Sequence, residues 1–175
     1  MMRRMILGLA VLTASGGCAM SQGGTAAPAR GSAVALLKTS TGSDAGRAVA
    51  TQDGARIRVA VEATGMPAGT HGIHVHTTGR CNAPDFASAG PHWNPTTMKH
   101  GTRNPAGPHA GDLPNLEIGT DGRGSLTMSL PAGPLDAMLD ADGAALVVHA
   151  SADDLVTDPS GNSGGRIACG VFTVS

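Results

Sequence analysis

Aromatic side chains are scarce in this chain of 175 residues: tyrosine is absent, and phenylalanine and tryptophan together number three. The core must therefore be built from Val, Leu, Ile, Ala and Met. Glycine (26) and proline (11) are abundant, which fits many short strands joined by turns better than a helical bundle. The sequence also lacks a basic stripe or an acidic tail, and its net charge is −1. It therefore gives no support to a nucleic-acid or membrane-surface partner.

The first 18 residues have the pattern of an export signal. Basic residues 3–4 precede an apolar run, 5–12, that is too short to span a bilayer. Small residues then end in Cys18, as in a bacterial lipoprotein signal, in which the cysteine becomes the lipidated N-terminus. Ser15 stands where leucine is usual, so ordinary cleavage near Ala19 is the alternative. We expect an exported protein of the periplasm or cell envelope, with a lipid on Cys18 as its only link to the membrane.

The three cysteines agree with export. If Cys18 belongs to the signal, Cys81 and Cys169 remain as a pair, and an oxidising compartment would let them bond. Closing a loop of roughly 90 residues would contribute about 4 to 5 kcal/mol in the chain-entropy model. Residues 19–31 are rich in Gly, Ala and Ser and are typical of a flexible tether, which leaves 32–175 as one domain.

Within this domain, apolar residues alternate as they do in β-strands. In 56–62 the apolar side chains at 57, 59 and 61 share a face, and Asp53-Gly54 before them is a hairpin signal. Further strands are expected at 33–37, 46–51, 116–118, 126–130, 145–149 and 167–174, with one helical turn near 135–139. About eight strands and little helix predict an all-β antiparallel sandwich or flattened barrel.

The seven histidines gather in and beside two long segments that lack strand pattern, 77–111 and 150–165. His74 and His76 would project from one face of a strand. A lone pair of this kind is usually a polar pair on a solvated face. Further candidate ligands follow, however: His92, His100, His109, Asp112 and His149. Imidazole with one carboxylate suits zinc and copper, and a metal ion would give the Gly/Pro-rich loop the core that it lacks.

These residues lie in motifs that resemble those of the copper,zinc superoxide dismutases. The matching motifs are GIHVH (72–76), SAGPHWNP (88–95), KHG (99–101), HAGDL (109–113), LVVH (146–149), ADDL (152–155) and GGRIACGV (164–171). The resemblance runs from about residue 32 to 175 and implies an eight-stranded antiparallel Greek-key β-barrel with two long functional loops.

The resemblance also assigns roles to single residues. It implies copper ligands at His74, His76, His92 and His149, and zinc ligands at His92, His100, His109 and Asp112, so that His92 bridges both metals. Asp153 would link a copper histidine to a zinc histidine, and His71 would hydrogen-bond backbone near the copper strand. The implied disulfide, Cys81–Cys169, would tie the long loop to the last strand.

The implied reaction is the dismutation of superoxide to O2 and H2O2, an antioxidant activity. Copper would cycle between Cu(II) and Cu(I), zinc would be structural, His92 would exchange a proton, and Arg166 would dock the anion. One departure concerns assembly. Cys81 follows His76 by five residues, as in certain bacterial members. Bacterial and eukaryotic members pair through different surfaces, so a homodimer is compatible with the sequence but no interface is carried over.

Two other functions are compatible with part of this pattern. Some chains of this fold have lost copper ligands and serve in metal handling; here all four copper histidines and Arg166 are present, which favours the enzyme. A zinc-stabilised adhesive domain would need only the zinc ligands and would leave His149 and Arg166 without a purpose.

Overall fold

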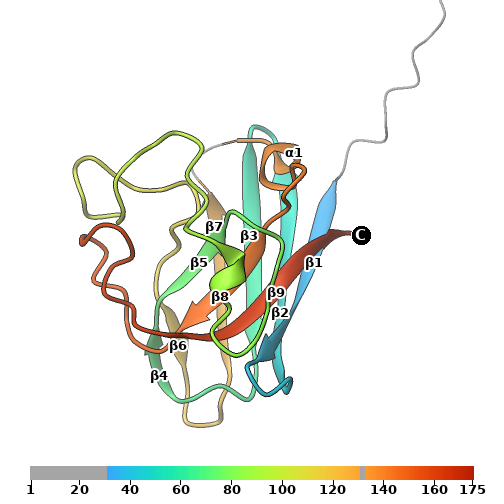
Figure 1. Cartoon of the computed structure of the whole chain (residues 1–175), viewed down its shortest axis with the longest axis vertical. Helices are drawn as coiled ribbons and strands as arrows, with labels where there is room; N and C mark the ends of the chain where they lie inside the picture. The colour runs from blue at the N-terminus through green and yellow to red at the C-terminus, as the bar shows by residue number, and fades with distance from the viewer. Residues whose placement is uncertain (1–30, 131–132) are drawn as a thin grey trace, which may run out of the picture.

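Nine β-strands dominate the computed structural model, which describes residues 31–130 and 133–175 (Figure 1). In chain order they are β1 (Ser32–Thr39), β2 (Asp44–Asp53), β3 (Arg56–Ala63), β4 (Gly69–His71), β5 (Ile73–His76), β6 (Leu116–Ile118), β7 (Gly124–Leu130), β8 (Ala145–His149) and β9 (Arg166–Val174). The described helical structure is a 3-10 turn, η1 (Ala87–Ala89), and one α-helical turn, α1 (Leu135–Met138). The predicted all-β class is therefore confirmed. The predicted signal with Cys18, and the tether except for Gly31, lie outside the described residues.

The number of strands exceeds the expected eight because Gly72 divides one stretch into β4 and β5. A side chain at this position would collide with Ser163, whose Cβ would lie 2.7 Å from the added Cβ. The two short strands have different neighbours, since β4 pairs with β6 and β5 pairs with β8. The break thus lets one run of chain close the fold and carry the histidine pair.

All strand pairings are antiparallel. One sheet has the order β5-β8-β9-β1-β2-β3-β7, and a second consists of β4 and β6. β6 also lies next to β7, to which it is joined through a tight turn closed by a 2.8 Å bond from the amide of Gly119 to the carbonyl of Arg123. The chain leaves β3, skips the positions of β7 and β6, and enters β4, which is a Greek-key connection.

Small and aliphatic side chains fill the core, as the shortage of aromatics predicted. The alternation seen in the sequence places Ile57, Val59 and Val61 of β3 inside. On β1 and β2 the inward positions are mostly alanines, which are fully buried, so the two faces of the fold approach closely. Of the apolar residues of β7, Leu130 is fully buried, whereas Leu126 and Met128 are partly buried against the core.

The two segments without strand pattern are loops that lie together at the β5 end of the fold (Figure 1). One connects β5 to β6 and the other connects β8 to β9. They are bonded to each other through backbone, for example from the amide of Arg103 to the carbonyl of Leu155 at 2.9 Å. The predicted functional loops are therefore packed against each other as well as against the barrel.

Candidate metal centre

The strand β5 is buried along its whole length and carries His74 and His76. Val75 lies between these two histidines, and the long loop between β5 and β6 passes beside it twice. The amide of Val75 donates to the carbonyl of Gly111 at 2.9 Å, and its carbonyl accepts the amide of Trp93 at 2.8 Å. These contacts bring His92 and Asp112, the chain neighbours of Trp93 and Gly111, opposite the strand histidines.

Gly111 is required for this close approach. A Cβ at this position would lie 2.3 Å from the carbonyl oxygen of Val75, a contact that real Cβ atoms do not make. The pairing of loop and strand, and with it the placement of Asp112, therefore depends on the absence of a side chain.

In the described part of the chain, four buried imidazole nitrogens lack a hydrogen-bond partner: Nδ1 of His74 and Nε2 of His76, His92 and His149. The four side chains are candidates for a shared cation, with ligand atoms within 4.8 Å of one another. A buried polar atom without a partner costs about 1 to 3 kcal/mol, so four of them at one place need a common partner. Neutral imidazoles are good ligands for copper, and the predicted copper ligands fit that ion.

The predicted zinc ligands surround one carboxylate oxygen. Oδ1 of Asp112 lies 2.9 Å from Nδ1 of His92, 3.1 Å from Nδ1 of His100 and 3.3 Å from Nδ1 of His109. Nδ1 of His109 lies 3.4 Å from Nδ1 of His92. In a tetrahedral zinc site with bonds of about 2.0 Å, the ligand atoms are about 3.3 Å apart. These four distances lie close to the spacing that zinc requires.

His74 also lies near part of this second set, within 4.8 Å of His92, His100 and Asp112. Its Nε2, however, contacts Asp153, and its free Nδ1 belongs to the first set. We therefore assign the fourth zinc position to His109. His92 is shared, with Nδ1 in the zinc set and Nε2 in the copper set.

Asp153 lies between the two sets and contacts one histidine of each. Its Oδ2 accepts from Nε2 of His74 at 2.6 Å, and its Oδ1 accepts from Nε2 of His100 at 3.0 Å. Such partners fix the tautomer and orientation of a ligand ring. Asn115, which sequence reasoning missed, holds the backbone of Asp153 in both directions, at 2.8 and 2.9 Å. No spacing in the sequence marks this asparagine.

His71 contacts backbone and is outside both sets. Its Nδ1 lies 2.8 Å from the carbonyl oxygen of His149, and its Nε2 lies 2.9 Å from that of Pro67. It therefore joins the end of β8 to the turn before β4.

Arg166, the first residue of β9, is tied to the long loop. Its guanidinium donates to the carbonyl of Phe86 at 2.7 Å and to that of Gly90 at 2.8 Å. The carbonyl of Gly90 also accepts Nδ1–H of His76 at 2.8 Å, so Arg166 shares an acceptor with a copper-set histidine. The sequence also allowed a surface arginine paired with Asp153 or Asp154, but neither ion pair forms among the described residues.

The disulfide between Cys81 and Cys169 is present. It joins the loop that carries the acceptors of Arg166 to the strand that carries Arg166 itself. Its sulfur atoms lie in a small buried cluster around Phe86 and Val147. The bond therefore maintains the register between the arginine and its two carbonyl acceptors.

Burial sets the protonation of the copper-set histidines. Removal from water lowers the pKa of His74 to about 3, that of His76 to about 2 and that of His149 to about 4. The desolvated ring disfavours the positive charge. These rings are therefore neutral at pH 7 and offer lone pairs to a cation.

His100 behaves in the opposite way. Burial alone would lower its pKa, but the hydrogen bonds and charges of Asp112 and Asp153 outweigh it and raise the pKa to about 9. Burial would likewise raise the pKa of Asp112, but its hydrogen bonds with His100 and His92 hold it well below its usual range. A cation at this set therefore takes the place of a proton on His100.

Comparison with known proteins agrees with this geometry. The family model described as copper/zinc superoxide dismutase (SODC) matches residues 44–172. The chain is 40% identical to Superoxide dismutase [Cu-Zn] of Caulobacter vibrioides over 148 residues, which are 81% of this chain and 85% of that protein. It is 48% identical to Superoxide dismutase-like protein YojM of Bacillus subtilis over 111 residues, 61% of this chain, but covers only 57% of that protein's length.

A solved structure is also similar. The crystal structure of a SOD-like protein from Bacillus subtilis superposes with a TM-score of 0.75 at 39% identity, covering 80% of this chain and 97% of that one. The family match covers most of the domain, and the donor sets lie inside it. The chain therefore belongs to the copper/zinc superoxide dismutase family.

Proposed function

We propose that this chain dismutates superoxide, converting two superoxide anions and two protons into O2 and H2O2, with copper held by the first donor set and zinc by the second. The observation that carries the proposal is His92. One ring nitrogen faces each set, and both sets lie in the buried interior. A structural zinc site alone would not need the other three copper-set nitrogens.

Copper, when bound, supplies the one-electron exchange between Cu(II) and Cu(I), which zinc cannot provide. The protein residues do the remaining work. Nδ1 of His92 is directed at Asp112 and the zinc set, so Nε2 is the atom that takes and returns a proton. Asp153 fixes the rings of His74 and His100 and thereby keeps the two sets in register.

Arg166 binds the anion. Two of the five N–H groups of its guanidinium donate to carbonyls, which fixes the plane of the group and leaves donors for a small anion. Because the same carbonyl of Gly90 orients His76, the position of the anion is coupled to that of a copper-set ring.

Activity tests this proposal directly. Protein loaded with both metals should remove superoxide, and His149→Ala should abolish this, because one of four copper donors is lost. Zinc content and far-UV circular dichroism of the variant should match the wild type, and wild type loaded with zinc alone serves as the inactive control. A fully metallated wild type that is inert, but binds copper tightly, would favour the metal-handling function instead.

We further propose that the chain works in the periplasm or cell envelope, anchored by lipid on Cys18. The basic and apolar pattern of residues 3–12 supports export, and a Cys81–Cys169 bond suits an oxidising compartment. Within residues 31–130 and 133–175, no helix has the length and hydrophobicity of a membrane span. Cys18→Ala should release the protein from membranes; a wild type that fractionates as soluble and takes up no labelled fatty acid would contradict the anchor. A homodimer is also predicted, and sedimentation velocity would distinguish it from a monomer.

A further inference from the structure

In four of the six candidate ligand histidines, the ring nitrogen that does not face a metal set has a hydrogen-bond acceptor. Nε2 of both His74 and His100 contacts Asp153, and Nδ1 of His76 and of His149 contacts a backbone carbonyl at 2.8 and 3.2 Å. The bridging His92 uses both nitrogens toward the metal sets. His109 is the remaining candidate ligand, and its Nε2 has no acceptor within hydrogen-bond distance among the described residues. The nearest carboxylate could serve as that acceptor.

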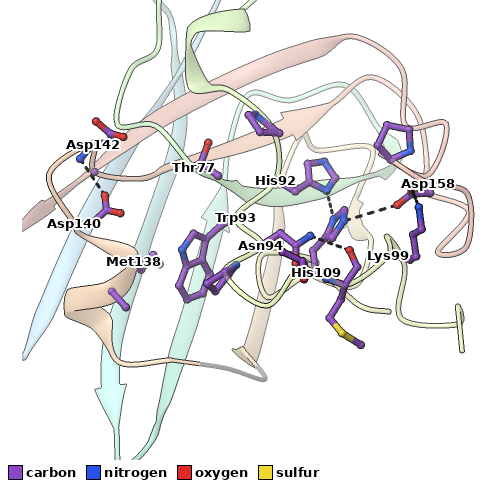
Figure 2. Close-up of a pocket in the computed structure, with 17 residues that line it drawn as sticks. Thr77, His92, Trp93, Asn94, Lys99, His109, Met138, Asp140, Asp142 and Asp158 are labelled. Atoms are coloured by element: carbon purple, nitrogen blue, oxygen red, sulfur yellow. Dashed lines mark hydrogen bonds and ion pairs between the residues drawn. The ribbon is translucent and has the colours of Figure 1, made fainter. Parts of the chain in front are cut away.

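That group is Asp158, in the loop between β8 and β9. Oδ1 of Asp158 lies 3.9 Å from Nε2 of His109 (Figure 2). The same oxygen accepts the backbone N–H of the zinc ligand His100 at 2.8 Å, and Oδ2 pairs with Nζ of Lys99 at 3.0 Å. Asp158 therefore contacts one zinc ligand through backbone and faces the side chain of another.

The distance to His109 is too long for a direct hydrogen bond. It can be bridged by one water molecule or closed by a shift of about 1 Å. Both residues line a cavity of about 580 Å³ (Figure 2), so water can reach the gap. The backbone N–H of His100 keeps the Asp158 carboxylate beside the ring, whereas the ion pair of Asp158 with Lys99 is exposed.

We propose that Asp158 is a positioning residue of the zinc centre: it serves as the outer acceptor for Nε2–H of His109 and so fixes the tautomer that presents Nδ1 to zinc. This inference rests on the proposed function, because it needs zinc at the second set. A carboxylate behind a ligand histidine raises the basicity of the ring and orients it, and loss of such a partner typically costs about 10- to 100-fold in metal affinity.

A purely structural reading is that Asp158 only fastens one loop to the other. Three variants distinguish this reading from the proposed one. Asp158→Asn retains an oxygen that can accept the N–H of His100 but loses the charge, whereas Asp158→Ala loses both. Lys99→Gln removes the exposed ion pair and leaves the carboxylate in place, so a loop fastener alone would be weakened by Lys99→Gln as well.

Asp154→Asn is the matched control. It makes the same chemical change in the same loop, and the hydrogen bonds of the Asp154 carboxylate among the described residues are with Val156, Thr157 and Asn162. It faces no histidine, so its loss should change zinc binding less than about threefold.

The experiment measures zinc affinity by competition with a chromophoric chelator, together with the visible spectrum of Co(II) bound in place of zinc. We expect Asp158→Ala to weaken zinc binding about 10- to 100-fold and to shift the Co(II) bands, with Asp158→Asn in between. Lys99→Gln and Asp154→Asn should stay within about threefold of wild type with unchanged spectra. Circular dichroism of each metal-free variant confirms that the fold is intact.

Several outcomes would overturn the proposal. A folded Asp158→Ala protein with wild-type zinc affinity and spectrum would do so, as would an equal loss in Asp154→Asn or Lys99→Gln. If Asp158→Ala does not fold, an unchanged affinity and spectrum in Asp158→Asn decides against the proposal. A wild type without zinc affinity would overturn the proposed function as well, whereas normal wild-type affinity with an unaffected Asp158 variant would overturn this inference alone.

Discussion

Removal of the Cys81–Cys169 bond is the perturbation for which the structure gives the clearest magnitude. The two cysteines are 88 residues apart in sequence. In the chain-entropy model, a cross-link over that separation restricts the unfolded state by about 4 to 5 kcal/mol. For a domain of this size, that loss corresponds to a fall of roughly 9 to 18 °C in melting temperature. Cys81→Ser combined with Cys169→Ser removes the bond without leaving a free thiol at either position.

The measurement should be made on metal-free protein, because bound metal adds its own stabilisation to the native state. Urea unfolding gives the free energy of unfolding, and calorimetry gives the melting temperature, for wild type and double variant in the same chelating buffer. A loss below about 1 kcal/mol would refute the loop-entropy reasoning.

A second effect of the same change concerns the metal loop. The disulfide keeps Arg166 in register with the carbonyls of Phe86 and Gly90. We therefore expect the double variant, when fully metallated, to show a weaker dependence of activity on Arg166, so that Arg166→Ala costs less in the variant than in wild type. Equal costs in both backgrounds would show that the arginine is positioned without the disulfide.

Three further predictions concern the site and its environment. Asp153→Asn should weaken both copper and zinc binding about 10- to 100-fold, because His74 and His100 lose their common carboxylate; chelator competition measures this, and unchanged affinities would contradict the bridge. Metal-free protein should lose stability as pH falls below 6.5, since burial lowers the pKa of His74 to about 3 and of His149 to about 4, so the unfolded chain takes up protons that the native one does not. The loss is about 2 kcal/mol per histidine between pH 6.5 and 5, and identical urea midpoints at the two pH values would refute it. Gly111→Ala should destabilise the metal-free protein by about 1 to 3 kcal/mol, measured by thermal unfolding, whereas a neutral effect would show that the loop can move away from β5.

The strands were predictable because their signal is local. Alternation of apolar residues in 56–62 and the turn signal at Asp53-Gly54 depend only on neighbours in sequence, and β2, β3 and their hairpin appear where they were expected. The break at Gly72 was not predicted, because the surroundings of this residue come from distant segments. Its amide donates to the carbonyl of Ser151 and its carbonyl accepts the amide of His149, both at 2.8 Å, and a side chain here would collide with Ser163.

The site shows the same division. Residue type and motif predicted the candidate ligands, because the sequence specifies which side chains carry an imidazole or a carboxylate. The resemblance already implied that both sets share His92. Which nitrogen of each ring faces which set, and the contact of Asn115 with the backbone of Asp153, could not be predicted from the sequence. These features depend on how the two loops pack against each other, and that packing is set by hydrogen bonds between backbone groups that are distant in sequence.

The sequence by itself thus determined the β-strand pattern, the scarcity of aromatics in the core and the kinds of ligand available, since these follow from side-chain chemistry and short-range periodicity. Only the tertiary structure decided the spacing of the donors and the position of Asp158 behind His109. The physical reason is that both come from packing the loop after β8 against the loop after β5, and no local pattern encodes a contact between segments 49 residues apart.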